Sequence, residues 1–245
     1  MNKITINLAI AACCLLATKV VAQTNESLDS ASNQLSMFDK KFRWGVSWNQ
    51  YWGNIVGDRL SEDYFGKPCI GTNARLEYYP LSFVGVGVGF GIQQRGAGII
   101  NPDNSGGSFT HPWEQPQFDG DSTYRQRLRF NTLELPVSIH LRTPKDVIKG
   151  VRPSLSAGVS YVKIFRVNDF FLSVEDGYHQ DKVVTGDYAA RDLAYQFTLG
   201  ADIDAGGTGI VQMHFVYTSG TSNLYARNQG DGRLITYGFR VSFLY

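Results

Sequence analysis

The stretch ITYGFRVSFLY, residues 235–245, alternates between two kinds of side chain. Every second residue from Ile235 to Tyr245 is apolar or aromatic, and the residues between them are polar or glycine, with Leu244 as the exception. A period of two is typical of a β-strand with one apolar and one polar face. A strand of this kind with aromatic residues on its apolar side indicates a transmembrane β-barrel.

Seven further segments from Phe42 onward alternate in the same way, which predicts eight strands in all. They are 42–51, 69–79, 83–95, 127–142, 150–164, 191–204 and 210–219, followed by 235–245. Pro136 falls on the polar side of the fourth segment and has no N–H for the sheet, which predicts a local bulge or bend there.

The connections between these segments alternate between long and short. The long ones are 52–68, 96–126, 165–190 and 220–234, and the short ones are 80–82, 143–149 and 205–209. Transmembrane up-and-down barrels have long loops on one side and tight turns on the other. The fold class predicted is therefore all-β, an eight-stranded antiparallel up-and-down transmembrane β-barrel, with its short turns in the periplasm.

The alternative is a soluble eight-stranded barrel, such as a lipocalin, with its apolar face inward. A strand face in contact with water is rich in Lys and Glu, whereas the polar face here is mainly Gly, Ser, Thr and Asn. Small residues with a few charges suit the narrow lumen of an eight-stranded barrel, which side chains can fill. We therefore expect the polar face to line a filled lumen without an open pore.

Charged residues in such a lumen need partners. The basic residues with lumen parity are Arg43, Arg75, Arg152 and Arg240, and the expected acidic partners are Glu77, Glu134, Asp202 and Asp204. A structural network of ion pairs is the main interpretation, and a ligand site or a proton path is the alternative. Gly85, Gly87, Gly89 and Gly91 share the same parity, and their spacing predicts a strip that admits bulky neighbouring side chains rather than a phosphate-binding loop.

The apolar face is expected to carry aromatic residues at two levels, one at each membrane interface. Those toward the long-loop ends of the strands are Trp48, Tyr161, Tyr195, Tyr217 and Tyr237, and those toward the turn ends are Tyr78, Phe243 and Tyr245.

The N-terminus has the pattern of a cleaved export signal. Lys3 precedes the apolar run 4–17, and Val20-Val21-Ala22 is a plausible cleavage site. Residues 10–13 resemble a lipoprotein processing site, which is the alternative. The predicted organisation is a signal peptide over 1–22, a flexible segment over 23–41 and the barrel over 42–245.

Cleavage after Ala22 changes the formal net charge from +1 to −1. A nearly neutral chain gives no support for nucleic-acid binding. Cleavage also removes Cys13 and Cys14, so Cys69 has no partner for an internal disulfide.

The sequence predicts no catalytic residue, no cofactor and no metal site. The four histidines, His111, His140, His179 and His214, are not at metal-ligand spacing. His214 near Ser219 or Ser222 invites comparison with outer-membrane lipid hydrolases, but its parity directs it into the lumen. The segments 103–106 and 119–121 resemble fragments of cation loops and are better explained as turns.

The long connection 96–126 is where a specific function is most expected. It combines aromatic and acidic residues: Phe109, His111, Trp113, Phe118 and Tyr124 with Asp103, Glu114, Asp119 and Asp121. This composition suits recognition of a protein or a sugar, and it equally suits a loop that folds onto the mouth of the barrel.

Two segments resemble Bacteroidetes outer-membrane barrels of the PorT-like family. Asn131-Thr132-Leu133-Glu134-Leu135-Pro136-Val137 is similar to a strand of that family that reads aromatic-Leu-Glu-Ile-Pro, and residues 217–224 are similar to its aromatic-Ser-x-Gly-Leu-x-Asn-Ile stretch. Thr221 departs from that pattern, where the family often has Leu. Phe243-Leu244-Tyr245 resembles the aromatic end that the outer-membrane assembly machinery reads. The resemblance covers about 42–245 and implies a non-enzymatic barrel in the outer membrane of a Gram-negative bacterium.

The expected function is a structural or surface-interaction role through extracellular loops, with membrane lipid and an unidentified extracellular or envelope protein as partners and no nucleic acid. An accessory role in a secretion or envelope-assembly complex, as in one PorT-like group, is the alternative. A lipid-modifying barrel enzyme ranks below both.

Overall fold

The computed structural model describes residues 37–57, 64–100, 124–173, 179–206, 208–225 and 232–245. These residues form nine strands: β1 (Phe42–Val56), β2 (Tyr64–Leu81), β3 (Val84–Ile100), β4 (Tyr124–Arg142), β5 (Val151–Ser173), β6 (His179–Val183), β7 (Arg191–Asp204), β8 (Ile210–Gly220) and β9 (Arg233–Leu244). Two 3-10 helices, η1 (Met37–Asp39) and η2 (Thr185–Asp187), complete the described elements. No helix within the described ranges has the length and apolar character needed to cross a membrane.

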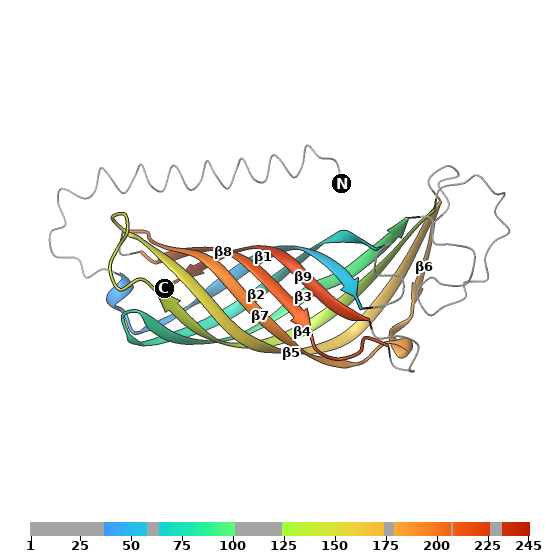
Figure 1. The fold of residues 1–245 in the computed structure, drawn as a ribbon, viewed down its shortest axis with the longest axis horizontal. Coiled ribbons are helices and arrows are strands. Elements are labelled where there is room, and N and C mark those ends of the chain that lie inside the picture. The colour runs from blue at the N-terminus through green and yellow to red at the C-terminus, as the bar shows by residue number, and fades with distance from the viewer. Residues whose placement is uncertain (1–36, 58–63, 101–123, 174–178, 207, 226–231) are drawn as a thin grey trace.

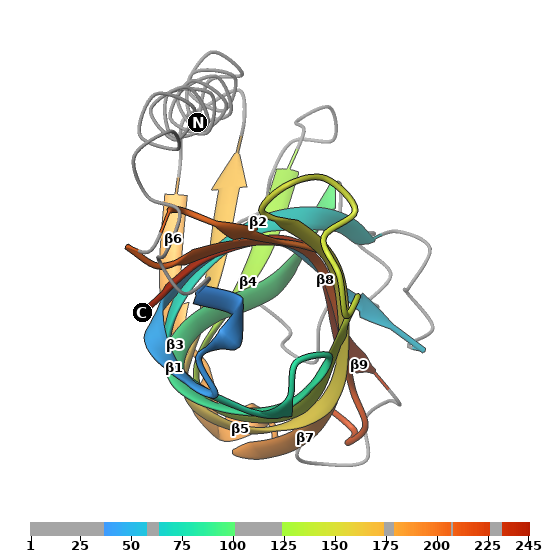
Figure 2. The ribbon, with the colours of Figure 1, turned by 90° about the vertical axis from the view of Figure 1, so that its left-hand side faces the viewer.

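Eight of these strands form a closed antiparallel barrel (Figures 1 and 2). The order of neighbours is β4-β3-β2-β1-β9-β8-β7-β5, and pairing of β4 with β5 closes the ring. The short connections 82–83, 143–150 and 205–209 meet at one end, which we call the turn end, and the opposite end is the loop end. The predicted eight-stranded antiparallel barrel is confirmed.

The strands reach further at the loop end than their alternation indicated. β5 continues to Ser173, and its last residues pair with the additional strand β6, which the sequence did not predict (Figure 1). A bulge explains the omission: Asn131 pairs with Arg166 but Thr132 pairs with Ile164, so β5 carries one extra residue. An extra residue shifts the inward–outward parity by one, and the period-two pattern is interrupted there.

Pro136 does not produce the predicted bulge. It lies opposite Ser160 in regular register with β5, and the β3–β4 ladder keeps one register above and below it. The pairing between β3 and β4 is interrupted at this level, since Val88 pairs with Val137 and the next paired residue is Gly91, with Glu134. The missing N–H therefore costs local pairing without changing the register.

The two faces of the sheet are as predicted. Phe197, Val137 and Phe239 point outward with 53%, 53% and 59% of their surface exposed, whereas Asp202 and Arg240 are buried inside. Leu244, the apolar exception in the last strand, is also buried, because it packs with Met37, Phe38 and Ile210 at the turn end. The prediction of a flexible segment over 23–41 does not hold for 37–39, where η1 buries Met37 and Phe38.

Candidate functional site: the filled lumen and its two closed ends

The glycine strip of β3 makes room for large side chains inside the barrel. A Cβ at Gly85 would lie 2.7 Å from the ring of Tyr79, and a Cβ at Gly87 would lie 2.5 Å from Nε2 of His140. At Gly91 a Cβ would collide with the side chain of Asn73. The interpretation of these glycines as space for bulky neighbours is confirmed.

The turn-side half of the lumen holds a network around Glu77. Arg75 Nη2 lies 2.8 Å from Glu77 Oε1, and Arg75 Nη1 donates to Gln212 Oε1 and to Ser242 Oγ, each at 3.2 Å. Gln212 Nε2 and Tyr79 Oη both donate to Glu77 Oε2 at 3.3 Å. These contacts join β2, β8 and β9 across the lumen, so the buried carboxylate is compensated from several sides.

The loop-side half contains a second buried ion pair. Arg95 Nε donates to Glu134 Oε1 at 2.7 Å, and Thr132 Oγ1 donates to the same oxygen at 3.2 Å. Glu134 was predicted from the sequence as an acidic residue of the lumen, whereas Arg95 was not predicted. Arg95 continues the inward parity of Gly85 to Gly91, and that signal was sufficient to find it.

Of the arginines predicted to pair with a carboxylate in the lumen, Arg75 does so, with Glu77. The other three arginines have different partners. Arg240 Nε donates to Asn49 Oδ1 at 2.9 Å, Arg152 Nε to Asp146 Oδ1 in the turn at 2.7 Å, and Arg43 Nη2 to the carbonyl of Phe38 at 3.0 Å. Asp202 accepts from Ser154, and Asp204 accepts from the backbone N–H of Met37. These partners are close neighbours: Asn49 lies directly opposite Arg240 on the adjacent strand, and Asp146 lies in the turn before β5. The parity of a sequence sorts side chains into inward and outward faces, but it does not show when a neutral side chain, a turn residue or a backbone carbonyl is the partner.

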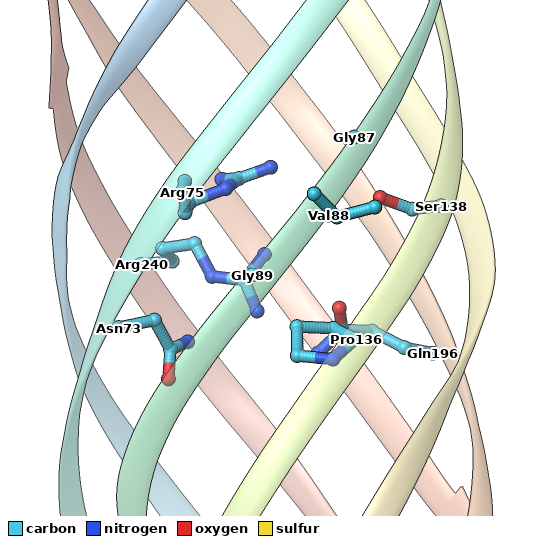
Figure 3. Close-up of a pocket in the computed structure, with 9 residues that line it drawn as sticks. All are labelled: Asn73, Arg75, Gly87, Val88, Gly89, Pro136, Ser138, Gln196 and Arg240. Carbon is cyan, nitrogen blue, oxygen red and sulfur yellow. The ribbon is translucent and has the colours of Figure 1, made fainter.

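A small cavity of about 10 Å³ lies between these networks (Figure 3). Arg75, Arg240 and Asn73 reach it from one side and Pro136, Ser138 and Gln196 from the other, beside Gly87, Val88 and Gly89. A space of this size holds about one water molecule. At this level the lumen is therefore filled by side chains.

The turn end is closed by η1, which sits inside the ring of strands (Figure 2). Phe38 is surrounded by three arginines, with the guanidinium carbons of Arg43, Arg142 and Arg152 at 5.9, 5.1 and 4.3 Å from its ring centre. Its carbonyl accepts hydrogen bonds from Arg43 and Arg142. Cation–π contacts and charge-assisted hydrogen bonds thus hold η1 in the turn end of the barrel.

The loop end is closed by an apolar cluster that the sequence reading did not anticipate. Its buried members are Ile55, Ala97, Leu128, Phe130, Val162, Ile164, Val167, Val184, Tyr188, Ala194, Leu224, Tyr225 and Leu234. The ring of Phe130 packs edge-on against Tyr188 at 5.1 Å, and Tyr188 lies 5.9 Å from Tyr225. Cys69 is buried below it and donates to the carbonyl of Lys67.

His214 does not meet Ser219 or Ser222. Its Nε2 lies 2.7 Å from Ser154 Oγ and 3.5 Å from Asp202 Oδ1, deep in the turn-side lumen. A catalytic triad needs the carboxylate on the ring nitrogen opposite the serine, whereas here both groups approach the same nitrogen and Nδ1 has no hydrogen-bond partner. This trio is therefore arranged as a structural hydrogen-bond cluster rather than for nucleophilic attack.

The other predicted residues are also dispersed. His140 lies in the lumen beside Ser138, 2.9 Å away, and His179 begins β6. Within the described ranges, no group of three or more His, Cys, Asp or Glu side chains could hold a metal ion. The segments 103–106 and 119–121, and most of the connection 96–126 with His111 and Trp113, lie outside the described residues.

Aromatic side chains mark both ends of the outward apolar face. Tyr161, Tyr195, Tyr217 and Tyr237 are exposed toward the loop end, and Tyr78, Phe243 and Tyr245 toward the turn end. Trp48 lies at mid-strand rather than near the loop end, because β1 continues to Val56. Trp52, whose ring stacks on that of Tyr237 with 6.3 Å between the ring centres, lies nearer the loop end of β1 than Trp48 does.

No family model matches the sequence, and no curated protein matches it. Three solved structures illustrate what the fold is similar to. Ail, the attachment invasion locus protein of Yersinia pestis, in complex with the heparin analogue sucrose octasulfate, is 13% identical over 84% of this chain and 100% of its own, with a TM-score of 0.40. Neisserial surface protein A is 9% identical over 83% and 97%, with a TM-score of 0.42. The outer membrane protein OprG from Pseudomonas aeruginosa is 10% identical over 83% and 94%, with a TM-score of 0.34. The resemblance to the PorT-like family finds no further support here and stays a prediction.

Proposed function

We propose that this chain is a non-enzymatic outer-membrane barrel with a sealed lumen, which acts through the structures at its loop end. The main support for this proposal is the orientation of the two faces of the sheet. Apolar side chains point outward around the barrel, while ion pairs and hydrogen bonds fill the inside. A protein in water does not expose an apolar surface of this extent. Hydrocarbon is the solvent that suits it.

The first experiment tests the membrane location. The full chain, extracted from membranes with detergent, is expected to migrate differently on a gel before and after boiling, as closed barrels do when they unfold. Recovery from the soluble periplasm without such a shift would reject the proposal. In planar bilayers we expect no stable single-channel conductance, because the lumen is filled.

The extension of the sheet at the loop end supports a surface role. β5 and β6 continue past the start of β7, so part of the sheet stands clear of the barrel (Figure 1). Such protruding segments are common sites of recognition. Protease added to intact cells is expected to cut within 96–126 before any turn, and cleavage at 143–149 instead would invert the proposed topology.

An accessory role in a secretion or envelope-assembly complex is the second candidate. One observation favours it: Val147 and Ile148, in the turn after β4, are 67% and 69% exposed. Two adjacent apolar side chains at the turn end offer a contact for a periplasmic partner.

A photo-crosslinking amino acid separates the two functions. Val183 of β6 and Val147 of the turn are both exposed valines, at opposite ends of the barrel. Protein adducts in living cells from position 183 would support the surface role, and adducts from position 147 would support the envelope complex. Adducts at neither position would leave a purely structural role.

A further inference from the structure

Basic side chains gather where the outward apolar face ends at the loop side. Along β5 the exposed Tyr161 is followed on the same face by Lys163, by the exposed Phe165 and, beyond the bulge, by Arg166. Along β7, Arg191 is the next outward residue past Leu193. On β4 the corresponding outward positions are Arg129 and Arg127. We call these residues, Arg127, Arg129, Lys163, Arg166 and Arg191, the basic margin.

The strand register brings these residues together into one surface. Lys163 pairs directly with Arg191, so their side chains stand side by side on the outer face. Arg166 pairs with Asn131, and Arg129, two positions further along β4, pairs with Asn168. The guanidinium of Arg129 lies 4.5 Å from the ring centre of Phe170, and its buried Nε has no hydrogen-bond partner among the described residues.

Nearby carboxylates do not neutralise this surface. Asp192 points inward and accepts from the backbone N–H groups of Thr221 and Ser222. Asp169 also points inward, where Gln126 donates to it at 2.7 Å. Asp181 shares the outer face and accepts from Asn168 Nδ2. Lys163, Arg166 and Arg191 make no ion pair with any residue in the described ranges, so the margin keeps an excess of positive charge.

The turn end is different. There the outward residues at the strand ends are Phe42, Tyr78, Leu141 and Phe243, all apolar or aromatic. The exposed lysines at that end, Lys40, Lys41, Lys145 and Lys149, lie just before β1 or in the turn after β4 rather than on the strands. Among the described residues, the cations at the loop end therefore lie on the paired strands themselves, in line with the outward apolar side chains.

We propose that the basic margin binds the phosphate groups of a phosphorylated glycolipid in the leaflet at the loop end. This inference rests on the proposed membrane location. Arg and Lys side chains at the edge of the apolar face reach the headgroup level, and the planar guanidinium fits phosphate with two parallel hydrogen bonds. The acyl chains of the same lipid would lie along Tyr161, Leu193 and Leu133 below.

Binding of diphosphoryl lipid A to the purified full chain in detergent micelles, followed by native mass spectrometry, tests the proposal. The variant combines Lys163→Gln, Arg166→Gln and Arg191→Gln, three exposed side chains outside the lumen. Its matched control combines Lys40→Gln, Lys145→Gln and Lys149→Gln at the turn end. A basic residue near an anionic membrane surface contributes roughly fivefold in affinity, so we expect binding about 100-fold weaker in the variant and unchanged in the control.

Each outcome has a defined meaning. Equal affinity of the wild type and the margin variant, or equal binding of lipid A without its phosphates, would overturn the proposal. Displacement of lipid A by millimolar inorganic phosphate would show a free-anion site instead and would also overturn it. Heat-modifiable migration of every variant keeps this test separate from the membrane proposal, since a chain that lacks it fails at the earlier step.

Discussion

The two ends of the barrel are closed by opposite chemistries. At the turn end a three-residue 3-10 helix places Phe38 among the guanidinium groups of Arg43, Arg142 and Arg152. At the loop end the strands themselves supply an apolar core around Phe130 and Tyr188. The 3-10 helix η1 is a local addition at the turn end, whereas the residues of the loop-end cluster come from six strands and from the connections between them. We therefore expect the loop end to contribute more to global stability.

The largest effect is expected for Phe130→Ala. Truncation of a fully buried phenylalanine leaves a cavity and costs about 3–5 kcal/mol. Urea unfolding in lipid vesicles, followed by tryptophan fluorescence, measures the loss. Phe83→Ala, at the exposed turn 82–83, is the control and should change stability by less than about 1 kcal/mol. A loss below about 1 kcal/mol for Phe130→Ala would mean that the apolar cluster is not a core.

Val137→Arg tests the surface that joins the two ends. Arg on the lipid-facing side near the membrane midplane costs about 2–4 kcal/mol, and near an interface only about 0–1 kcal/mol. The matched control is Val147→Arg, the same substitution in the exposed turn. If both substitutions are tolerated equally, the outward face does not contact hydrocarbon. The same unfolding assay in vesicles serves here.

Phe38→Ala measures how much η1 contributes to stability at the turn end. The loss is expected to be about 1–2 kcal/mol, because η1 can open locally while the barrel stays paired, and the free energy of this local opening limits what the substitution can cost. Hydrogen exchange should increase around η1 and remain unchanged at Phe130. A destabilisation as large as that of Phe130→Ala would remove the contrast between the two ends.

The smallest effect is expected for Asp146→Asn in the turn that anchors Arg152. Partial burial raises the pKa of Asp146, but hydrogen bonds from Arg152 and from the N–H of Gly150 outweigh it, so its pKa lies below the ordinary value. A lowered folded-state pKa contributes stability above the unfolded value of about 3.9, and this contribution is lost as the pH falls through the folded value.

Because the carboxylate of this pair remains accessible to solvent, we expect a cost below about 1 kcal/mol at pH 7. In unfolding experiments the difference between the wild type and Asp146→Asn should shrink as the pH falls below the unfolded value of about 3.9, and it should vanish once Asp146 is protonated in the folded state as well. A difference that persists there would assign the effect to the shape of the turn rather than to the charge.

The alternation of residues was sufficient to predict the strands and their faces, because burial in a thin barrel repeats every second residue. Phe197, Val137 and Phe239 point outward for that reason. The partners of Arg240 and Arg152 were not predicted, because parity matched the arginines only with inward carboxylates. Arg240 donates to Asn49, a neutral neighbour on β1, and Arg152 donates to Asp146 in the adjoining turn. The pairing of β5 with β6 was not predicted, because the bulge near Arg166 shifts the inward–outward parity of β5. The helix η1 was not predicted, because three residues are too few to show a period.

The buried position of Cys69 has a practical consequence. It is the one thiol that remains after the predicted cleavage at Ala22, and its side chain is 1% exposed. A maleimide reagent should label it rapidly while the chain is still unfolded in transit and stop doing so once the barrel closes. The rate at which Cys69 becomes protected from the reagent therefore reports the rate of barrel closure, without an engineered label.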